Sequence, residues 1–267
     1  MLRYSLAKAV ARPKGSRIIL PPVSPRLAPE RQYLAALRRI LAEAGREVRE
    51  TIYPLYEAEK AQKRAERAYS ADAGQEWFIR LRSLLRAMDA TAHGMVRNIL
   101  DLEAKQHTKG FMAAAKKALG IDLAAVVRDE DLTVYVETAV ARNVSLITNF
   151  SDELLKRIEQ TVYDNSIAGN TVATLKAKLK EQFGIADRRA QLIARDQVGK
   201  FTGDLNRKRQ QQAGIEEYEY MTSHDERVRP LHQSYDGKTF RWDTPPADGH
   251  PGTAIRCRCI ARGIVSF

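Results

Sequence analysis

Residues 223–259 read "SHDERVRPLHQSYDGKTFRWDTPPADGHPGTAIRCRC", and this stretch decides how the C-terminal part of the chain is interpreted. It holds three of the five histidines and both cysteines of the 267-residue sequence. Gly, Pro and Asp recur along it, which predicts turns and long loops in place of regular structure. Three interpretations fit this composition: a metal-dependent active site, a small cross-linked fold, or a recognition surface.

The two cysteines, Cys257 and Cys259, are separated by one residue. A disulfide between positions i and i+2 would close a strained loop, and the sequence holds no other cysteine that could pair with either. We therefore expect free thiols or metal ligands, as in a protein made in a reducing compartment.

Zinc is the metal that thiolate and imidazole ligands favour. The candidate ligands are Cys257, Cys259, His232 and His250, with His224 close by in sequence. If both cysteines lie on one strand, their sulfur atoms share a face; zinc sites, however, usually place about two to four residues between cysteines. Two alternatives stay open: a zinc site, or buried thiols with the histidines bonded in turns. We expect no cofactor, with zinc as the alternative.

The segments flanking this stretch predict a small α+β module over residues 142–267. Ser151 and Asp187 are expected to cap two helices, and the second of these runs to about residue 212 with basic residues on its outer face, Arg209 among them. Residues 217–222 alternate with a period of two, which predicts a strand. A closing strand is expected within residues 254–265, so the module has short strands and long loops.

Residues 30–141 predict a helical domain. Apolar residues recur every three or four positions, and Pro54 is expected to end or kink the first helix. A further short helix is expected at residues 111–120. The fold class is therefore α+β, with a mainly α-helical N-terminal half of long helices. The two apolar stripes are Tyr33, Leu34, Leu37, Leu41, Ala44, Val48 and Ile52, then Trp77, Leu81, Leu84, Met88, Met95, Ile99 and Leu102.

Residues 1–29 form a basic, proline-rich arm. The arm contains six Lys or Arg residues, no acid, and five of the ten prolines. Because proline fixes φ and lacks an N–H donor, we expect this arm to be extended and to lie along a partner.

The net charge of +11 favours an acidic partner, such as nucleic acid, an anionic membrane or an acidic protein surface. The apolar runs are far shorter than the ~20 residues that span a bilayer, so we expect no membrane segment. Arg227 and Arg229 could bind phosphate or carboxylate, or pair internally with Asp225 or Asp243. Candidate contacts to DNA or an acidic surface are Arg3, Lys8, Arg12, Lys14, Arg17, Arg188, Lys200, Arg207 and Lys208.

The order and spacing of the motifs resemble the C-terminal signature of the phage Mu F-like minor head proteins, also called phage head-morphogenesis proteins. The upstream helix "RAQLIARDQ" matches too, at Arg189, Ala190, Ile193, Ala194 and Arg195. Two departures are Asp196-Gln197 in place of Thr-Glu, and Arg256 in place of the Asn before C-R-C. The matching motif residues are Asp225, Arg227, Val228, Arg229, His232, Gly237, Phe240, Pro245, Pro246, Cys257, Arg258 and Cys259.

This resemblance implies a non-enzymatic, low-copy minor head protein of a tailed phage or prophage. Such a protein acts near the portal in head assembly, DNA packaging or ejection. The implied partners are the portal protein, the major capsid protein, or both. The basic arm and the basic helix face are expected to contact either an acidic protein surface or packaged double-stranded DNA, the latter without sequence preference. The implied location is the virion head or neck, on the inner side of the capsid, after assembly in the host cytoplasm.

Two alternatives from other functional classes remain. A metal-dependent nuclease or toxin-like effector could use His232 with nearby carboxylates such as Asp225, Asp236 and Asp248. A small zinc-binding adaptor would need only the Cys and His ligands.

Overall fold

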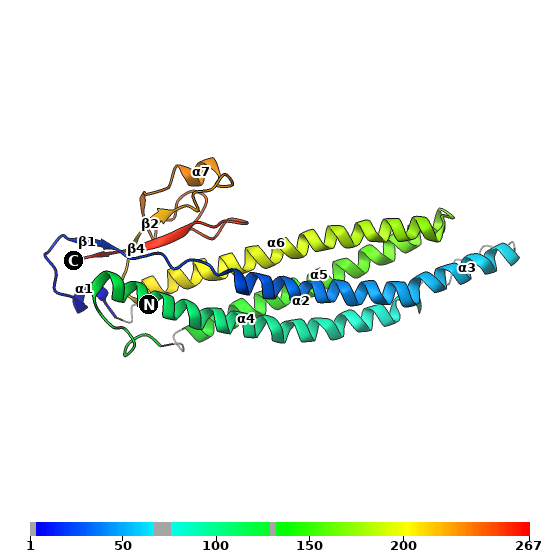
Figure 1. The fold of residues 1–267 in the computed structure, drawn as a ribbon, viewed down its shortest axis with the longest axis horizontal. Coiled ribbons are helices and arrows are strands. Elements are labelled where there is room, and N and C mark those ends of the chain that lie inside the picture. Colours follow the sequence, from blue (N-terminus) through cyan, green and yellow to red (C-terminus); the bar gives the residue numbers. More distant parts are fainter. Residues whose placement is uncertain (1–3, 67–75, 129–131) are drawn as a thin grey trace. The chain divides into compact units, whose positions relative to one another are not determined.

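The structure is a computed structural model that describes residues 4–66, 76–128 and 132–267 (Figure 1). Long helices account for most of it. The helices are α1 (Leu6–Ala9), α2 (Leu27–Glu47), a π-helical turn (Val48–Ile52), α3 (Tyr53–Glu66), a 3₁₀ turn (Glu76–Phe78), α4 (Ile79–Leu119), α5 (Thr133–Ile167), α6 (Val172–Gln212) and α7 (Pro230–Gln233).

Four short strands form one antiparallel sheet in the order β1-β4-β2-β3. The strands are β1 (Arg17–Ile19), β2 (Glu217–Met221), β3 (Thr239–Arg241) and β4 (Ile260–Ser266). The alternation expected after residue 216 is present, because Tyr218 and Tyr220 are buried while their neighbours in β2 are half-buried. Tyr218 pairs with Gly263 on one side and Phe240 on the other. The predicted α+β class is confirmed.

The contacts divide the chain into two compact units, each built from separate segments. Unit 1 takes the chain up to Glu30, Asn98–Ala139 and Ala194–Phe267, whereas unit 2 takes Arg31–Arg97 and Val140–Ile193. The domains predicted at residues 1–29, 30–141 and 142–267 remain predictions.

Unit 2 buries the first predicted apolar stripe. Tyr33, Leu37, Ala44, Val48 and Ile52 are all buried, as a 3.6-residue period requires. The second stripe is partly wrong: the burial pattern of α4 includes Leu85 and Val96, while Leu102, which belongs to unit 1, is 46% exposed.

Pro54 does not end the helix that precedes it. The chain continues into α3 after a π-helical turn at Val48–Ile52. Proline removes one N–H donor and its ring crowds the carbonyl four residues earlier, which here belongs to Glu50 inside the widened turn. The wider turn accommodates the ring and keeps the helix going.

Both predicted caps are wrong, because Ser151 and Asp187 lie inside helices. Ser151 is buried in α5 and hydrogen-bonds to Asp89, and Asp187 in α6 accepts two hydrogen bonds from Arg38, at 2.7 and 3.1 Å. The expected short helix at 111–120 is the end of α4, and Gly120, with φ of +75°, follows it in the left-handed conformation that glycine tolerates.

The described part of the arm packs against unit 1. β1 pairs with β4, with Arg17 opposite Ser266. Leu6 and Leu20 are buried in one apolar core with residues of α4 and β4, among them Phe111, Leu119 and Val265. The arm is thus extended over much of its length, but it completes the sheet and core of its own unit.

Within the described residues, none of the helices combines the length and the apolar character that a bilayer-spanning helix needs.

Candidate functional site

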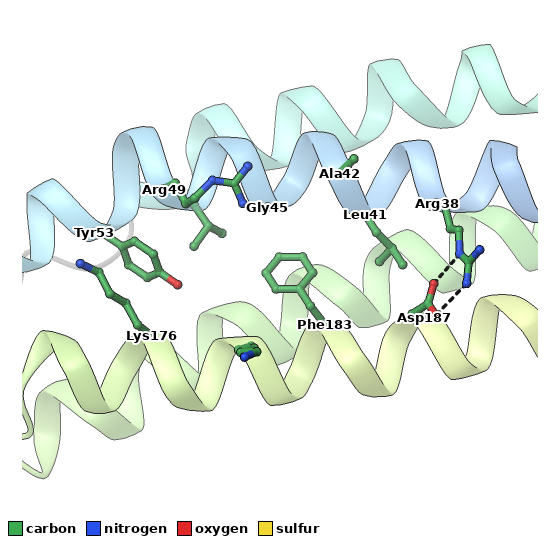
Figure 2. A pocket seen from close by; sticks show the side chains of 11 residues that line it. Arg38, Leu41, Ala42, Gly45, Arg49, Tyr53, Lys176, Phe183 and Asp187 are labelled. Atoms are coloured by element: carbon green, nitrogen blue, oxygen red, sulfur yellow. Dashed lines mark hydrogen bonds and ion pairs between the residues drawn. The ribbon is translucent and has the colours of Figure 1, made fainter.

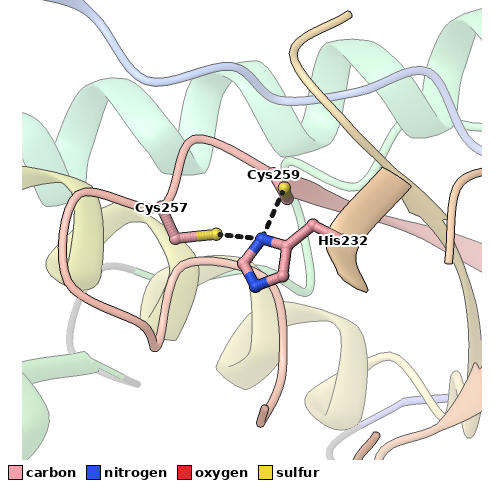
Figure 3. Close-up of side chains that lie close together, drawn as sticks. All are labelled: His232, Cys257 and Cys259. Carbon is pink, nitrogen blue, oxygen red and sulfur yellow. Dashed lines mark hydrogen bonds between the residues drawn. The ribbon is translucent and has the colours of Figure 1, made fainter. Parts of the chain in front are cut away.

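His232 is carried into the site by the short helix α7. Arg229 is extended, and Pro230 at the first helical position starts the turn because its fixed φ suits a helix. Cys257 and Cys259 lie in the irregular segment before β4 and not on a strand. Their sulfur atoms nevertheless face the same imidazole ring (Figure 3).

His232, Cys257 and Cys259 make up what we call the Cys/His cluster. Nδ1 of His232 is 3.4 Å from Sγ of Cys259 and 3.7 Å from Sγ of Cys257. The other ring nitrogen, Nε2, is 2.5 Å from Oδ2 of Asp248. His232 is 4% exposed, so this arrangement is fixed inside the fold.

Further groups hold the sulfur atoms of the cluster. The Gly252 N–H donates to Sγ of Cys257 at 3.4 Å. Gly252 has φ of +88° and lies so close to Gly203 of α6 that a Cβ on it would be 3.2 Å from the Gly203 Cα. The Tyr220 hydroxyl hydrogen-bonds to Cys259. Burial raises the pKa of Tyr220, which keeps that hydroxyl protonated as a donor.

The two thiols differ in acidity. Their mutual hydrogen bond lowers the pKa of Cys257, assisted by the Gly252 N–H. The same bond, together with burial, raises the pKa of Cys259. The first proton to leave the pair therefore leaves Cys257, the sulfur with the backbone donor.

A cavity of about 390 Å³ opens beside the Cys/His cluster. All three cluster residues line it, and none of its described lining residues is an Asp or Glu. We call it the arginine cavity. Its arginines are Arg195, Arg227, Arg229, Arg256 and Arg258.

The five guanidinium groups are not equally engaged. Arg258 forms a two-pronged ion pair with Asp225, and this bond lowers the pKa of that carboxyl. Arg229 donates to the carbonyl of Ile255 at 2.7 Å. Arg227 has an exposed contact of 3.6 Å with Glu226. One charge of five is neutralised by a firm pair, so the cavity keeps a strong positive potential.

The two departures from the family pattern contact each other. The backbone N–H of Arg256 donates to Oδ1 of Asp196 at 3.0 Å. Arg256 has φ of +59°, a left-handed conformation that asparagine adopts more readily than other side chains. The asparagine of the pattern would suit this backbone, whereas arginine accepts strain and adds a charge to the cavity.

Comparison with known proteins shows what the C-terminal part of the chain is similar to. Residues 156–262 match the family model of phage Mu protein F like proteins. We call residues 156–262 the Mu F-like region, after the family to which they are similar. An uncharacterized protein of Haemophilus influenzae is 35% identical over 147 residues, which cover 54% of this chain and 33% of that protein, so the chain spans about a third of that relative's length. No solved structure matches.

Of the candidate metal ligands in or beside the Mu F-like region, three converge and two do not. Nδ1 of His250 lies 2.9 Å from the Tyr218 hydroxyl, and Nε2 of His224 lies 2.9 Å from Asp236. The sequence indicates Asp248 only as a carboxylate for catalysis, and its spacing from His232 does not predict the bond between them.

Other motif residues of the Mu F-like region are structural. Gly237 adopts φ of +72° in the turn before β3. Phe240 and the buried Trp242 pack around Tyr218, with ring centroids 6.1 and 4.3 Å away. Pro246 is buried, while Pro245 is exposed. Trp242 belongs to one buried core cluster with Tyr218 and Tyr220.

The predicted basic contacts fall into several groups. Lys8, Arg12 and Lys14 are exposed, whereas Arg17 pairs with Glu217 at 2.7 Å; Arg3 lies outside the described residues. Of the candidates in α6, Arg188 and Lys208 are exposed, Arg207 is half-buried, and Lys200 pairs with Asp196 at 2.7 Å.

Arg209 was expected on the basic outer face of α6 and is instead fully buried. Its guanidinium donates to Thr108 Oγ1 at 2.9 Å and to the carbonyl of Arg128 at 2.8 Å. These hydrogen bonds compensate for burying the charge. The prediction that Arg209 lies on the exposed face of α6 is therefore wrong.

Unit 2 contains a separate cavity of about 720 Å³ between α2 and α6 (Figure 2). Phe183 and Leu41 point into it, Arg49 and Lys176 lie towards one end, and the Arg38–Asp187 pair closes the other. None of the residues singled out for chemistry in the sequence lines this cavity.

Proposed function

We propose that this protein is a minor head component of a tailed phage or prophage, acting near the portal and holding DNA through its phosphates. The match to the Mu F-like family supports a role in phage head morphogenesis, a structural task associated with the virion. The partners proposed are the portal protein, the major capsid protein, or both. The proposed location of the protein is the inner side of the head or neck of the virion.

The observation that carries the DNA part of the proposal is the arginine cavity. Guanidinium groups bind phosphate through two parallel hydrogen bonds, and a cavity without carboxylates in its described lining does not repel a phosphodiester. The exposed cations Lys8, Arg12 and Lys14 add to the positive field of the same unit. No base-reading arrangement is needed, so binding is independent of sequence.

The nuclease alternative has less support from the geometry. A general base needs a ring nitrogen or carboxylate free to reach a water molecule. Nε2 of His232 is engaged by Asp248, and Nδ1 faces two sulfur atoms. His232 is therefore held as part of a structural arrangement.

The head assignment predicts that this chain is found in purified phage heads at low copy number. Quantitative mass spectrometry of gradient-purified heads is expected to detect it at a small fraction of the major capsid protein. Heads that lack it, while infected lysates contain it, would remove it from the virion.

The DNA assignment predicts a steep loss of affinity with salt, since phosphate neutralisation releases counterions. Replacing Arg195, Arg227 and Arg256 by Gln is expected to reduce the slope of log K against log [salt] by up to about 3. Fluorescence anisotropy with duplexes of unrelated sequence measures the slope.

The matched control replaces three exposed arginines of unit 2, Arg31, Arg39 and Arg86, by Gln. It removes the same formal charge away from the cavity, and its slope should stay near that of the unmodified protein. Equal slopes for both triple variants would mean that the cavity does not hold phosphate.

A further inference from the structure

We propose that Cys257, Cys259 and His232 hold a Zn²⁺ ion, with Asp248 orienting the histidine. This inference goes beyond the proposed head function and does not depend on it. It rests on the distances within the Cys/His cluster, on the count of donors and acceptors, and on the bonds that surround the ligands.

The distances within the cluster fit a tetrahedral ion. Zinc–sulfur bonds of about 2.3 Å and zinc–nitrogen bonds of about 2.1 Å place sulfur and nitrogen about 3.6 Å apart in a tetrahedron. Nδ1 of His232 lies 3.4 and 3.7 Å from the two sulfur atoms. All three donor atoms lie within 4.8 Å of one another, so one ion can reach all three.

Hydrogen bonds alone cannot join both sulfur atoms to the histidine nitrogen at the same time. Because Nε2 donates its proton to Asp248, Nδ1 has one lone pair and no hydrogen. Two thiols converge on that lone pair, but only one S–H can use it, and the other thiol bonds to the neighbouring sulfur. A metal ion satisfies the nitrogen and both sulfur atoms at once.

The surrounding bonds are those that metal ligands require. A zinc-bound histidine usually donates its other N–H to a carboxylate, which fixes the ring and its tautomer, and Asp248 does this here. The Gly252 N–H and the Tyr220 hydroxyl donate to Cys257 and Cys259, and such donors stabilise thiolates better than thiols. Zinc binding would release both thiol protons as the Zn–S bonds form.

The fourth coordination position faces the arginine cavity, because all three ligands line it. A water molecule or a small anion can occupy that position, as in zinc sites with three protein ligands. The ion would also join the segment that carries His232 to the one that carries both cysteines, across a region with little regular structure.

Metal analysis of the full-length protein tests this proposal directly. Protein purified under reducing conditions is expected to contain stoichiometric zinc by mass spectrometry of the elements. Cobalt exchanged into the site should give the visible bands of tetrahedral coordination and near-ultraviolet thiolate charge transfer. Protein that takes up neither zinc nor cobalt, with both thiols equally reactive before and after a chelator, would overturn the proposal.

Variants locate the ion. Cys257→Ser should abolish the thiolate charge transfer of one sulfur and weaken zinc binding. Asp248→Asn, which leaves all three ligands in place, should raise the zinc dissociation constant about 10–100-fold. The matched control is His250→Gln, a histidine of the same module that lies outside the cluster, and its zinc content should not change.

The wild-type cobalt spectrum keeps the proposal testable if a variant fails to fold, and circular dichroism identifies that case. Zinc retained at full affinity in both Cys257→Ser and Asp248→Asn would place the ion elsewhere. Failure of the salt-slope experiment leaves this outcome unaffected, because DNA is absent from every measurement here.

Discussion

His107 shows how one side chain can make stability depend on pH. It is 2% exposed in α4, its Nε2 lies 3.2 Å from Asn206 Oδ1, and burial lowers its pKa to about 4, with the charge of Arg209 acting in the same direction. The unfolded chain therefore takes up this proton first as the pH falls. Stability is full above about pH 6.5 and decreases towards pH 4.

The expected loss from His107 reaches about 3 kcal/mol in the free energy of unfolding by pH 4. His107→Gln should remove this part of the pH dependence, as measured by urea unfolding at several pH values. His93→Gln, at a half-buried histidine, serves as the control and should keep the wild-type slope. A His107→Gln protein that loses stability as steeply as wild type would contradict the assignment.

At the residue scale, the sequence identified all three residues of the Cys/His cluster as candidate metal ligands, but not Asp248, which bonds to His232. Thiols and imidazoles are recognisable by type, so Cys257, Cys259 and His232 could be named. His250 could not be excluded, because its bond to Tyr218 joins residues 32 positions apart in the sequence, and local sequence does not reveal such a contact. The role of Asp248 was missed for the same reason.

At the element scale, α1 and β1 show that the arm is a structural part of unit 1. Leu6 is fully buried against residues of α4 and β4. Leu6→Ala is expected to cost about 3 kcal/mol of unfolding free energy, since it removes buried methyl groups and leaves a cavity. Chemical denaturation measures this, and exposed Leu27→Ala is the control. A cost below about 1 kcal/mol would mean that the arm packs only loosely.

Helix periodicity predicted α2 well and failed at the helix boundaries. The buried stripe from Tyr33 to Ile52 follows from local spacing alone. Ser151 and Asp187 have the chemistry of capping residues, but their oxygen atoms bond to Asp89 and Arg38 from other helices. Such tertiary partners override a local capping preference, and one sequence does not reveal them.

At the scale of the whole molecule, the sequence predicts domains as continuous segments, with one domain boundary at residue 141. The contacts collect each compact unit from segments far apart in the chain, and α2, α4, α5 and α6 contribute residues to both units, while the predicted domain boundaries stay predictions. Changes of composition along the chain mark where one type of sequence gives way to another. They do not show which distant segments pack together.

The strand order β1-β4-β2-β3 has a consequence for synthesis on the ribosome. β4 lies between β1 and β2 and is hydrogen-bonded to both. The strand of residues 17–19 therefore cannot pair until residues 260–266 have been synthesised and have left the ribosome. A nascent chain stalled before Ile260 would expose two unpaired strand edges, and such edges recruit other chains.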